Sequence, residues 1–465
     1  MNPISGSASW VVSHPDRLAV ASGDVRWSYR DLDLAVQRWA DRLAARGVSG
    51  GDRVAHLSRV TPDAVALAHA IWRLGAVAVP LNTRLTAAEL APQIEALSPR
   101  LTLVDPSFAD RAALEGERPS RRSSGETDTA AILFTSGTTG RPRAAALSRE
   151  NLLAAARASA ANAGGAPEDR WILCLPLFHV GGLTMLHRCA TYGAALFLQE
   201  RFDAEAANRA IDVDGITHTS LVATTLRRLL DARGDRPFPP TLRAILIGGG
   251  PVPPALLDRA RSLGAPVLQT YGLTESCAQV TTERPGEADG LTAGPPLPGL
   301  RVRIVDADGN DLPPGAVGEI EVSGPTVFQG YAGDESETHQ TLWKGWLRTR
   351  DLGSLDGRGR LTVAARRTDL IISGGENVYP AEVEAVLLGA PGVLDAAVFA
   401  RPDDEWGQVP VAAVVAGPGF SPQEADRHCR AHLAGFKVPR RFVILPELPR
   451  NAAGKLDRAA LGRFE

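Results

Sequence analysis

At 465 residues, with 44% hydrophobic and 22% charged residues, the chain has room for two to four domains and the composition of an ordinary globular protein. Its formal net charge of -3 argues against a nucleic-acid partner. No stretch approaches the roughly 20 apolar residues of a membrane span. The first residues lack the features of a secretory signal, and the four cysteines lack CxxC spacing. We therefore expect a cytoplasmic protein without a zinc site or disulfide framework.

The first 110 residues alternate between helical and strand patterns. Residues 30–46 carry apolar residues at helical spacing, and 61–74 and 86–97 each open on a threonine, a residue that caps helices. Residues 53–57, 76–80 and 101–104 are short apolar runs typical of buried strands. This alternation predicts a largely parallel α/β sheet that serves as scaffold. Residues 106–127 are polar and predicted to be a loop.

The stretch that follows the apolar run 130–133 has the composition of a phosphate-binding loop. Two glycines let the backbone approach a ligand closely, and hydroxyls and backbone N–H groups can donate to phosphate oxygens. It is no Walker A loop, because Gly-Lys-Ser/Thr is absent and Pro142 prevents a helix from starting there. A Ser/Thr/Gly-rich surface turn is the alternative. The candidate phosphate ligands are Thr135, Ser136, Gly137, Thr138, Thr139, Gly140 and Arg143.

After a predicted helix at 150–163, several apolar runs end in residues suited to binding. Residues 171–176 lead to His179, which either lines a pocket or is a satisfied turn residue. Residues 242–247 end in Gly248, Gly249 and Gly250, where a flat ligand can lie on bare backbone. Residues 267–270 lead into Tyr271-Gly-Leu-Thr274-Glu275, at the strand end where α/β sheets bind ligands. Beside a polyphosphate, Glu275 would require Mg²⁺; a solvated glutamate is the alternative.

From residue 299 the pattern changes to a small antiparallel β region, and the last hundred residues fit a small α+β domain with a helix at 380–388. The chain contains only three lysines: Lys344, Lys437 and Lys455. Where arginine supplies almost every positive charge, a remaining lysine is a candidate for a site that needs a compact ammonium. Chance retention is the alternative for each of them. Lys455 lies in a polar loop near the end of the chain.

Five stretches, in this order, resemble the adenylate-forming superfamily of acyl-CoA synthetases, adenylation domains and luciferases. They are the loop at 135–143, Tyr271 to Glu275, Gly345 to Asp351, Arg366 with the Gly-Gly-Glu-Asn that follows it, and Gly454-Lys455. The resemblance covers essentially the whole chain. It implies an α/β fold: a large N-terminal domain of α/β layers plus a small β region (1–366), then a small, mobile α+β C-terminal domain (367–465).

The same resemblance implies ATP, Mg²⁺ and coenzyme A as reactants or cofactors and a small carboxylic acid as substrate. The 135–143 loop would hold the β- and γ-phosphates, Gly249 and Gly250 would contact the nucleotide, and Tyr271 would stack on adenine. Thr274 would contact the α-phosphate, Glu275 would hold Mg²⁺, and Asp351, supported by Arg366, would accept the ribose hydroxyls. Lys455 would bridge the substrate carboxylate and the α-phosphate. The catalytic set is therefore Lys455, Thr274 and Glu275.

Within the superfamily, residues 171–183, 248–257 and 271–279 resemble most the ligases of o-succinylbenzoate, an aromatic keto-diacid of menaquinone biosynthesis. The polar candidates for the acid pocket are His179, Thr184, Ser220, Thr225, Gly248 and Gln279. Another aryl or small-acyl CoA ligase, a stand-alone enzyme that loads a carrier protein, and a nucleotide binder without turnover are the alternatives. A homodimer is compatible with the sequence.

Three positions depart from the superfamily's pattern. Arg143-Ala144 replaces the usual Lys-Gly, Ala365 replaces the usual Gly before Arg366, and the hinge position, usually charged, is Thr368. Arginine can still contact phosphate, but Ala144 is expected to stiffen the loop. Domain rotation is therefore less directly implied than adenylation.

Overall fold

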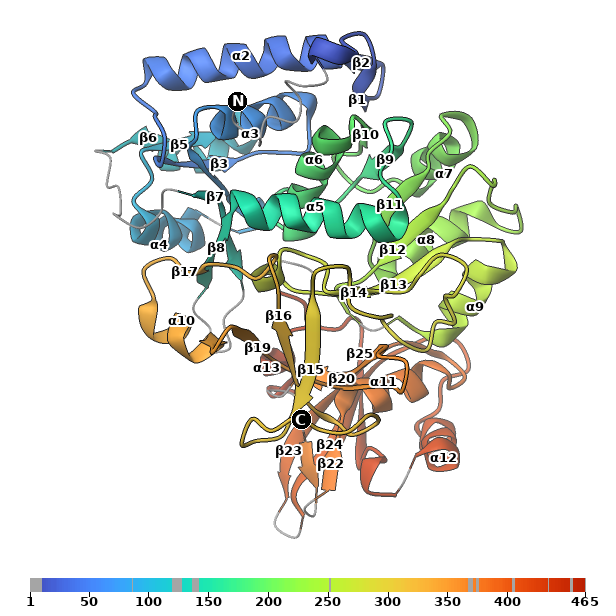
Figure 1. Ribbon diagram of the computed structural model, residues 1–465. Helices are drawn as coiled ribbons and strands as arrows, with labels where there is room; N and C mark the ends of the chain where they lie inside the picture. Colours follow the sequence, from blue (N-terminus) through green and yellow to red (C-terminus); the bar gives the residue numbers. More distant parts are fainter. Residues whose placement is uncertain are drawn as a thin grey trace. The chain divides into compact units, whose positions relative to one another are not determined.

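The computed structural model describes residues 11–85, 87–118, 128–135, 142–250, 252–366, 371–373, 376–403, 406–433, 435–451 and 455–464 (Figure 1). The chain divides into two compact units. The first comprises Met1–Gly250, Arg259–Val302 and Glu321–Arg348, and the second comprises Pro251–Asp258, Arg303–Ile320 and Thr349–Glu465. No helix in the described ranges is long and apolar enough to cross a membrane.

An eight-stranded sheet in the first unit contains Ser220 and Tyr271 and leads into the glycines 248–250 and the residues Thr274 and Glu275. Its order is β14-β13-β12-β11-β9-β10-β1-β2, and the strands from β13 to β1 are parallel to their neighbours. β2 and β14 add antiparallel edges. The strands are β1 (Leu18–Ser22), β2 (Val25–Ser28), β9 (Arg170–Leu173), β10 (Ala195–Leu198), β11 (His218–Leu221), β12 (Ala244–Ile247), β13 (Val267–Tyr271) and β14 (Thr281–Thr282).

A seven-stranded sheet, in the order β17-β8-β7-β4-β3-β5-β6, contains the strand that precedes the predicted phosphate loop. β5, β3, β4 and β7 are mutually parallel, as the alternating pattern predicted. β8 then returns antiparallel to β7, and β17 pairs with β8. The strands are β3 (Arg53–Leu57), β4 (Val77–Pro80), β5 (Leu101–Val104), β6 (Gly116–Glu117), β7 (Thr129–Thr135), β8 (Arg143–Ser148) and β17 (Gly330–Tyr331).

The first helices begin where capping side chains predict. Ser28 caps α2 through Asp31, Thr61 accepts from the Ala64 amide at the start of α3, and Ser148 caps α5. The helices up to residue 341 are α2 (Tyr29–Ala45), α3 (Pro62–Arg73), α4 (Ala87–Leu97), α5 (Arg149–Ala163), α6 (Val180–Tyr192), α7 (Ala204–Val213), α8 (Ala223–Arg233), α9 (Pro254–Ser262) and α10 (Glu335–Thr341).

Two expectations for this part of the chain were wrong or incomplete. Residues 106–127 were expected to be a loop, but Pro106–Leu114 form a 3₁₀ helix, η1, whose first turn is capped by Asp105. Asp105-Pro106-Ser107 suits a helix start as well as a turn, so composition alone did not distinguish the two. Helix α6 was also missed, because its first turn contains Gly181 and Gly182, which have low helix propensity.

Residues 301–366 form the predicted β region, and the described residues after them form a C-terminal α+β fold. Strands β15 (Arg301–Val305), β16 (Gly318–Ser323), β18 (Leu342–Trp343), β19 (Trp346–Leu355) and β20 (Leu361–Arg366) give the β region between residues 301 and 366. The C-terminal sheet has the order β22-β21-β24-β23, with β25 parallel to β24. Its elements are β21 (Ile371–Ser373), β22 (Glu376–Val378), α11 (Pro380–Leu388), β23 (Val393–Asp403), β24 (Gly407–Ala416), α12 (Pro422–His432), η4 (Gly435–Lys437), β25 (Arg441–Leu445) and α13 (Arg458–Leu461).

The last hundred residues form the small α+β fold that the sequence predicts, and the helix predicted at 380–388 is α11. β23 and β24 form a hairpin between α11 and α12. A core of Ile371, Val383, Val398, Val414 and Cys429 holds this sheet against the two helices. The predicted hinge at 366–369 and the domain boundary there stay predictions, since residues 367–370 lie outside the described ranges.

Four buried histidines make the stability of the first unit sensitive to acid. Burial lowers the pKa of His56, His187 and His218 to about 4 and that of His69 to about 3. Because the folded state resists protonation, stability is fully present above pH 6.5 and is lost as the pH falls toward 4. We expect acidification from pH 7.5 to 5 to cost about 2 kcal/mol per histidine. Urea unfolding at several pH values measures this.

The contribution of a single histidine is measured by comparing the slope of the free energy of unfolding against pH between a variant and the parent protein. His69→Leu should reduce proton uptake on unfolding near pH 5.5 by about one, even if it also changes the absolute stability. The exposed His432 offers a matched variant, His432→Asn, which should leave the slope unchanged. An identical slope in His69→Leu and the parent would contradict the assignment.

Candidate active site

The carboxyl ends of three parallel strands, β11, β12 and β13, bring together residues far apart in the sequence. β11 and β12 pair through Leu221 and Ile247, and β12 and β13 pair through Ile247 and Gln269. Gly248 therefore lies directly beside Thr270: a Cβ at Gly248 would approach the Thr270 carbonyl oxygen to 3.0 Å. The structure thus places the glycines 248–250, Ser220 and Tyr271 at one sheet edge, where parallel α/β sheets bind ligands.

Thr274 and Glu275 lie in a tight nine-residue loop, residues 272–280, that joins β13 to β14. The loop contains a short 3₁₀ helix, η2 (Thr274–Ser276). Two consecutive non-glycine residues follow in the left-handed region, Cys277 at φ 55° and Ala278 at φ 85°. Ser276 stabilises the turn by hydrogen bonds to the Leu273 amide and carbonyl. Such strained backbone persists only where its surroundings enforce it, and it is common in functional sites.

The carboxylate of Glu275 is held by the phenol of Tyr331. The Tyr331 hydroxyl donates to Glu275 Oε1 at 2.8 Å. Burial and the neighbouring Glu275 carboxylate raise the pKa of Tyr331 well above its usual value, so the phenol remains a donor. Tyr331 lies in β17 and was not predicted as a site residue. Its only sequence signal was an aromatic residue after a glycine, which is too common to be informative.

Arg143 extends this cluster toward the predicted phosphate loop. β7 and β8 pair through Thr135 and Arg143, so these two residues mark where the chain leaves and returns from that loop. The Arg143 guanidinium pairs with Glu337 at 2.9 Å and lies 5.6 Å from the centre of the Tyr331 ring. The structure therefore joins Thr135, Arg143 and Glu275 in one place. Ser136, Gly137, Thr138, Thr139 and Gly140 lie outside the described residues.

The predicted acid-pocket residues fall on several elements, and some hydroxyls also serve local structure. His179 is the N-cap residue of α6, with its ring against Phe178. The Thr184 hydroxyl donates to the Val180 carbonyl, and the Thr225 hydroxyl caps α8 through the Val222 backbone. Each hydroxyl keeps acceptor capacity. Their roles toward a substrate stay predictions.

A buried arginine that sequence reasoning missed lies beside Gln279. Arg188 of α6 is 6% exposed, and its Nη2 donates to Gln279 Oε1 at 3.1 Å. Its guanidinium lies 4.9 Å from the centre of the Trp171 ring, while its Nε is buried without a hydrogen-bond partner among the described residues. Burial lowers the pKa of Arg188, as expected for a cation taken out of water. The available sequence signal was an arginine flanked by apolar residues such as Leu186 and Cys189, in a helix without another residue of the Asp, Glu, Lys or Arg type.

In the second unit, Asp351 and Arg366 are cross-strand partners. The antiparallel register of β19 and β20 pairs Asp351 with Arg366, the two residues that the resemblance associates. Asp351 is 7% exposed and follows Arg350, which has a φ of 60°. Lys455 closes a short loop: its amide donates to Asn451 Oδ1 at 3.1 Å, and the Asn451 amide donates to the Lys455 carbonyl at 2.8 Å. Its side chain is exposed.

The described residues suit a magnesium nucleotide better than a metal held by protein alone. They contain no group of three acidic, histidine or cysteine residues that could form a metal cage. Mg²⁺ typically takes one or two carboxylates together with substrate phosphates and water. Glu275, joined through Tyr331 to the phosphate-loop residue Arg143, suits that ligand set, while the other carboxylate of the cluster, Glu337, is paired with Arg143.

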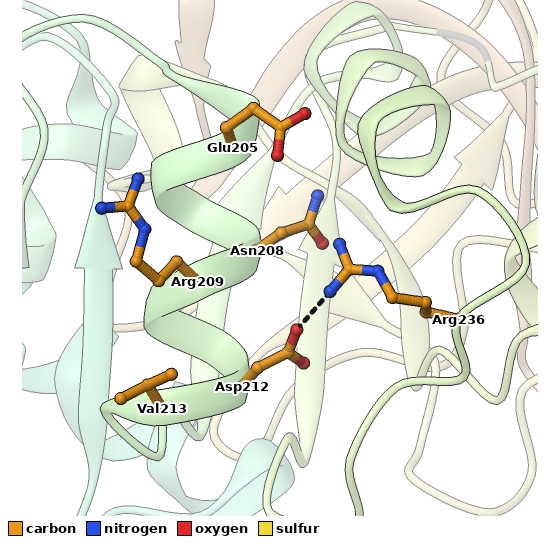
Figure 2. A pocket seen from close by; sticks show the side chains of 6 residues that line it. All are labelled: Glu205, Asn208, Arg209, Asp212, Val213 and Arg236. Atoms are coloured by element: carbon orange, nitrogen blue, oxygen red, sulfur yellow. Dashed lines mark hydrogen bonds and ion pairs between the residues drawn. The ribbon is translucent and has the colours of Figure 1, made fainter.

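A hollow of about 350 Å³ lies elsewhere, along α7 (Figure 2). Two of its charged lining residues, Asp212 and Arg236, form an ion pair with each other. It contains none of the predicted site residues. We assign it no role.

The family model of AMP-binding enzymes matches residues 8–332, and that of the AMP-binding enzyme C-terminal domain matches residues 382–455. The chain therefore belongs to the family of AMP-binding enzymes.

Similarity to individual relatives extends along the whole chain. The 2-succinylbenzoate–CoA ligase of Bacillus licheniformis is 40% identical over 96% of this chain and 97% of its own length. The corresponding ligase of Bacillus cytotoxicus is 39% identical over 96% and 95%. The protein is thus an acyl-adenylate-forming, AMP-forming acid–CoA ligase.

Solved structures of related enzymes are similar to this chain over nearly its whole length. The o-succinylbenzoate CoA synthetase of Bacillus subtilis, in complex with its acyl-adenylate intermediate, superimposes with a TM-score of 0.92 at 37% identity, covering 99% of this chain and 98% of that one. The same synthetase with ATP and a magnesium ion gives a TM-score of 0.91 at 37% identity, covering 98% and 99%.

Proposed function

We propose that this protein converts 2-succinylbenzoate, ATP and coenzyme A into 2-succinylbenzoyl-CoA, AMP and pyrophosphate, a step of menaquinone biosynthesis. The observation that favours a diacid is Arg188. A buried guanidinium with no carboxylate partner among the described residues is costly unless a ligand supplies the negative charge. The aryl carboxylate of 2-succinylbenzoate would supply it, and the full-length relatives named for this substrate support the choice.

In this proposal the nucleotide binds at the sheet edge of the first unit. Tyr271 and the glycines 248–250 contact the adenosine, and Thr274 contacts the α-phosphate. The loop from Thr135 to Arg143 binds the β- and γ-phosphates. Glu275 holds Mg²⁺, which when bound neutralises phosphate charge. Asp351, with Arg366 beside it in register, accepts the ribose hydroxyls.

The first half-reaction joins the acid to AMP. The succinyl carboxylate oxygen attacks the α-phosphorus, and the bond to the bridging oxygen of pyrophosphate breaks. Lys455, positioned between carboxylate and α-phosphate, stabilises the negative charge that builds on the phosphoryl oxygens. Arg143 and the loop hydroxyls stabilise the departing pyrophosphate.

In the second half-reaction the coenzyme A thiolate attacks the acyl carbonyl and AMP leaves. We propose that the C-terminal part, residues 367–465, rotates after the first half-reaction and before the second, and that this rotation moves Lys455 away from the acyl-adenylate. A cytoplasmic location, and a homodimer that light scattering would detect, are further parts of the proposal.

An acid panel tests the function. AMP release would be measured for 2-succinylbenzoate, benzoate, other aryl acids and short fatty acids, with and without coenzyme A. We expect coenzyme A-dependent turnover with the highest kcat/KM for 2-succinylbenzoate. A higher kcat/KM for another acid would overturn the substrate, and transfer to a carrier protein in place of coenzyme A would overturn the acceptor.

Replacing Arg188 by glutamine tests the diacid hypothesis separately. The variant loses the cation but keeps a hydrogen-bonding side chain. We expect KM for 2-succinylbenzoate to rise roughly 10- to 100-fold, the equivalent of one charged hydrogen bond. Turnover of a monocarboxylic aryl acid should change little. Initial-rate kinetics with both acids measure the difference.

The matched control is Arg209→Gln, on the exposed surface of α7. It should leave both KM values unchanged. Equal losses for the diacid and the monoacid in Arg188→Gln would mean that Arg188 supports the fold or the nucleotide site and does not select a diacid.

A further inference from the structure

A single short segment, residues 328–331, holds both the backbone carbonyl and the side-chain carboxylate of Glu275. The Phe328 amide donates to the Glu275 backbone carbonyl at 2.8 Å. The Tyr331 hydroxyl donates to the Glu275 side chain, also at 2.8 Å. One segment thus sets both the backbone position and the side-chain direction of this glutamate.

Tyr331 is itself tightly held. Its amide donates to the Thr338 hydroxyl of α10 at 2.8 Å, and in the register of β17 and β8 it pairs with Ala145. The preceding Gly330 has a φ of 130°, and a Cβ there would approach Thr338 Cγ2 to 2.5 Å. The Tyr331 ring packs edge-on against Phe328 and is 7% exposed. Its hydroxyl is therefore fixed relative to β8, the strand that leaves the phosphate loop.

The charge of the donor matters as much as its position. The Arg143 guanidinium lies 5.6 Å from the centre of the Tyr331 ring and pairs with Glu337. A cation that paired directly with Glu275 would neutralise the carboxylate and compete with a metal ion. A phenol fixes the carboxylate and leaves its negative charge in place, while Glu337 engages the nearby guanidinium.

We propose that Tyr331 is a positioning residue that orients the Glu275 carboxylate for the magnesium nucleotide. The proposal rests on the proposed function, in which Glu275 holds Mg²⁺. Tyr331 acts through Glu275 and does not touch the reacting atoms. Removing the hydroxyl should therefore weaken metal binding and leave metal-free nucleotide binding unaffected.

The experiment uses the full chain and the conservative variant Tyr331→Phe. Binding of Mn²⁺ in the presence of a non-hydrolysable ATP analogue, followed by electron paramagnetic resonance, is the first readout. We expect the apparent Kd for Mn²⁺ to rise about 10-fold. AMP affinity, measured by calorimetry without metal, should stay within 2-fold, roughly the noise of such a comparison. In pyrophosphate exchange, saturating Mg²⁺ should restore kcat, because mass action compensates for weaker binding.

Two controls separate the possible failures. Tyr29→Phe removes another buried phenol, one that donates to the Cys189 and Ala194 carbonyls away from the site, and should leave the Mn²⁺ Kd unchanged. Glu275→Gln should weaken Mn²⁺ binding more than Tyr331→Phe does. Adding Tyr331→Phe to Glu275→Gln should then have no further effect, because the partner of the hydroxyl is already altered.

The outcomes are distinguishable. Absence of Mn²⁺–nucleotide binding in the parent protein would overturn the proposed function. Wild-type Mn²⁺ affinity in Tyr331→Phe, with Glu275→Gln impaired, would overturn the role of Tyr331 alone. Loss of AMP affinity together with metal affinity would also overturn it, since it would show a general structural defect. A double mutant that adds the full 10-fold effect of Tyr331→Phe to that of Glu275→Gln would likewise overturn the role, because the hydroxyl would then act independently of Glu275. If Tyr331→Phe does not fold, Tyr331→Met, which keeps an apolar side chain without a donor, is measured in its place against the same expected results.

Discussion

Replacing Lys455 by alanine should lower ATP–pyrophosphate exchange by at least about 100-fold, the usual cost of removing a charged group from a developing oxyanion. Thioester formation from supplied acyl-adenylate should persist, since in the proposed mechanism Lys455 serves the first half-reaction only. Asn451 holds the backbone of Lys455, because its side-chain oxygen accepts from the Lys455 amide and its amide donates to the Lys455 carbonyl, while the Lys455 side chain is exposed. Radiolabelled pyrophosphate exchange and a coenzyme A-release assay measure the two halves.

The other lysines provide matched controls. Lys437 forms an ion pair with Glu382 at 2.7 Å, and Lys344 lies over the Trp343 ring. Each of these two lysines therefore has a structural role at the protein surface. Alanine at either position should change the rate of ATP–pyrophosphate exchange by less than about 2-fold, because surface interactions of this kind are weak. Lys455→Arg should restore little activity, because a guanidinium fork fixes a geometry that a moving phosphoryl group does not share. Equal loss of both half-reactions in Lys455→Ala would refute its role.

Much of the fold could be predicted because local signals and tertiary structure agree. Thr61 and Ser148 cap helices, and the apolar runs 53–57 and 101–104 are strands with the predicted bounds. The placement of the candidate binding residues at the ends of β12 and β13 was predictable for the same reason, because neighbouring parallel strands align their carboxyl ends. Helices such as α6 were missed where glycines with a packing role obscured the pattern.

The supporting residues of the site could not be predicted from local sequence. Tyr331 reaches Glu275 across 56 positions, and Gln279 meets Arg188 across 91. Such contacts depend on the sheet order and on which strand returns antiparallel, and neither is encoded in a short motif. Glu275 can be found from the sequence motif alone. Its contact with the Tyr331 phenol is apparent only from the fold.

Gly272 begins the loop that contains Thr274 and Glu275, and the loop leaves no room for a side chain at this position. A Cβ at Gly272 would lie 1.5 Å from the Ala278 carbonyl oxygen and 2.5 Å from its carbon, so no side chain fits without rebuilding the turn. We therefore expect Gly272→Ala to displace residues 272–280 and to abolish detectable ATP binding. The free energy of unfolding should fall by roughly 3 kcal/mol or more, the range for severe overpacking and lost backbone geometry. Calorimetry with ATP and urea unfolding measure the two effects.

Gly116→Ala is the matched control, because a Cβ there meets nothing within 4 Å and the glycine lies in an exposed edge strand. It should leave both ATP affinity and stability unchanged. The contrast also tests the strained pair Cys277 and Ala278: they adopt positive φ so that the chain can turn over Gly272 and return to β14. Normal ATP affinity in Gly272→Ala would show that the turn can relax, and that its strain is not what positions Thr274 and Glu275.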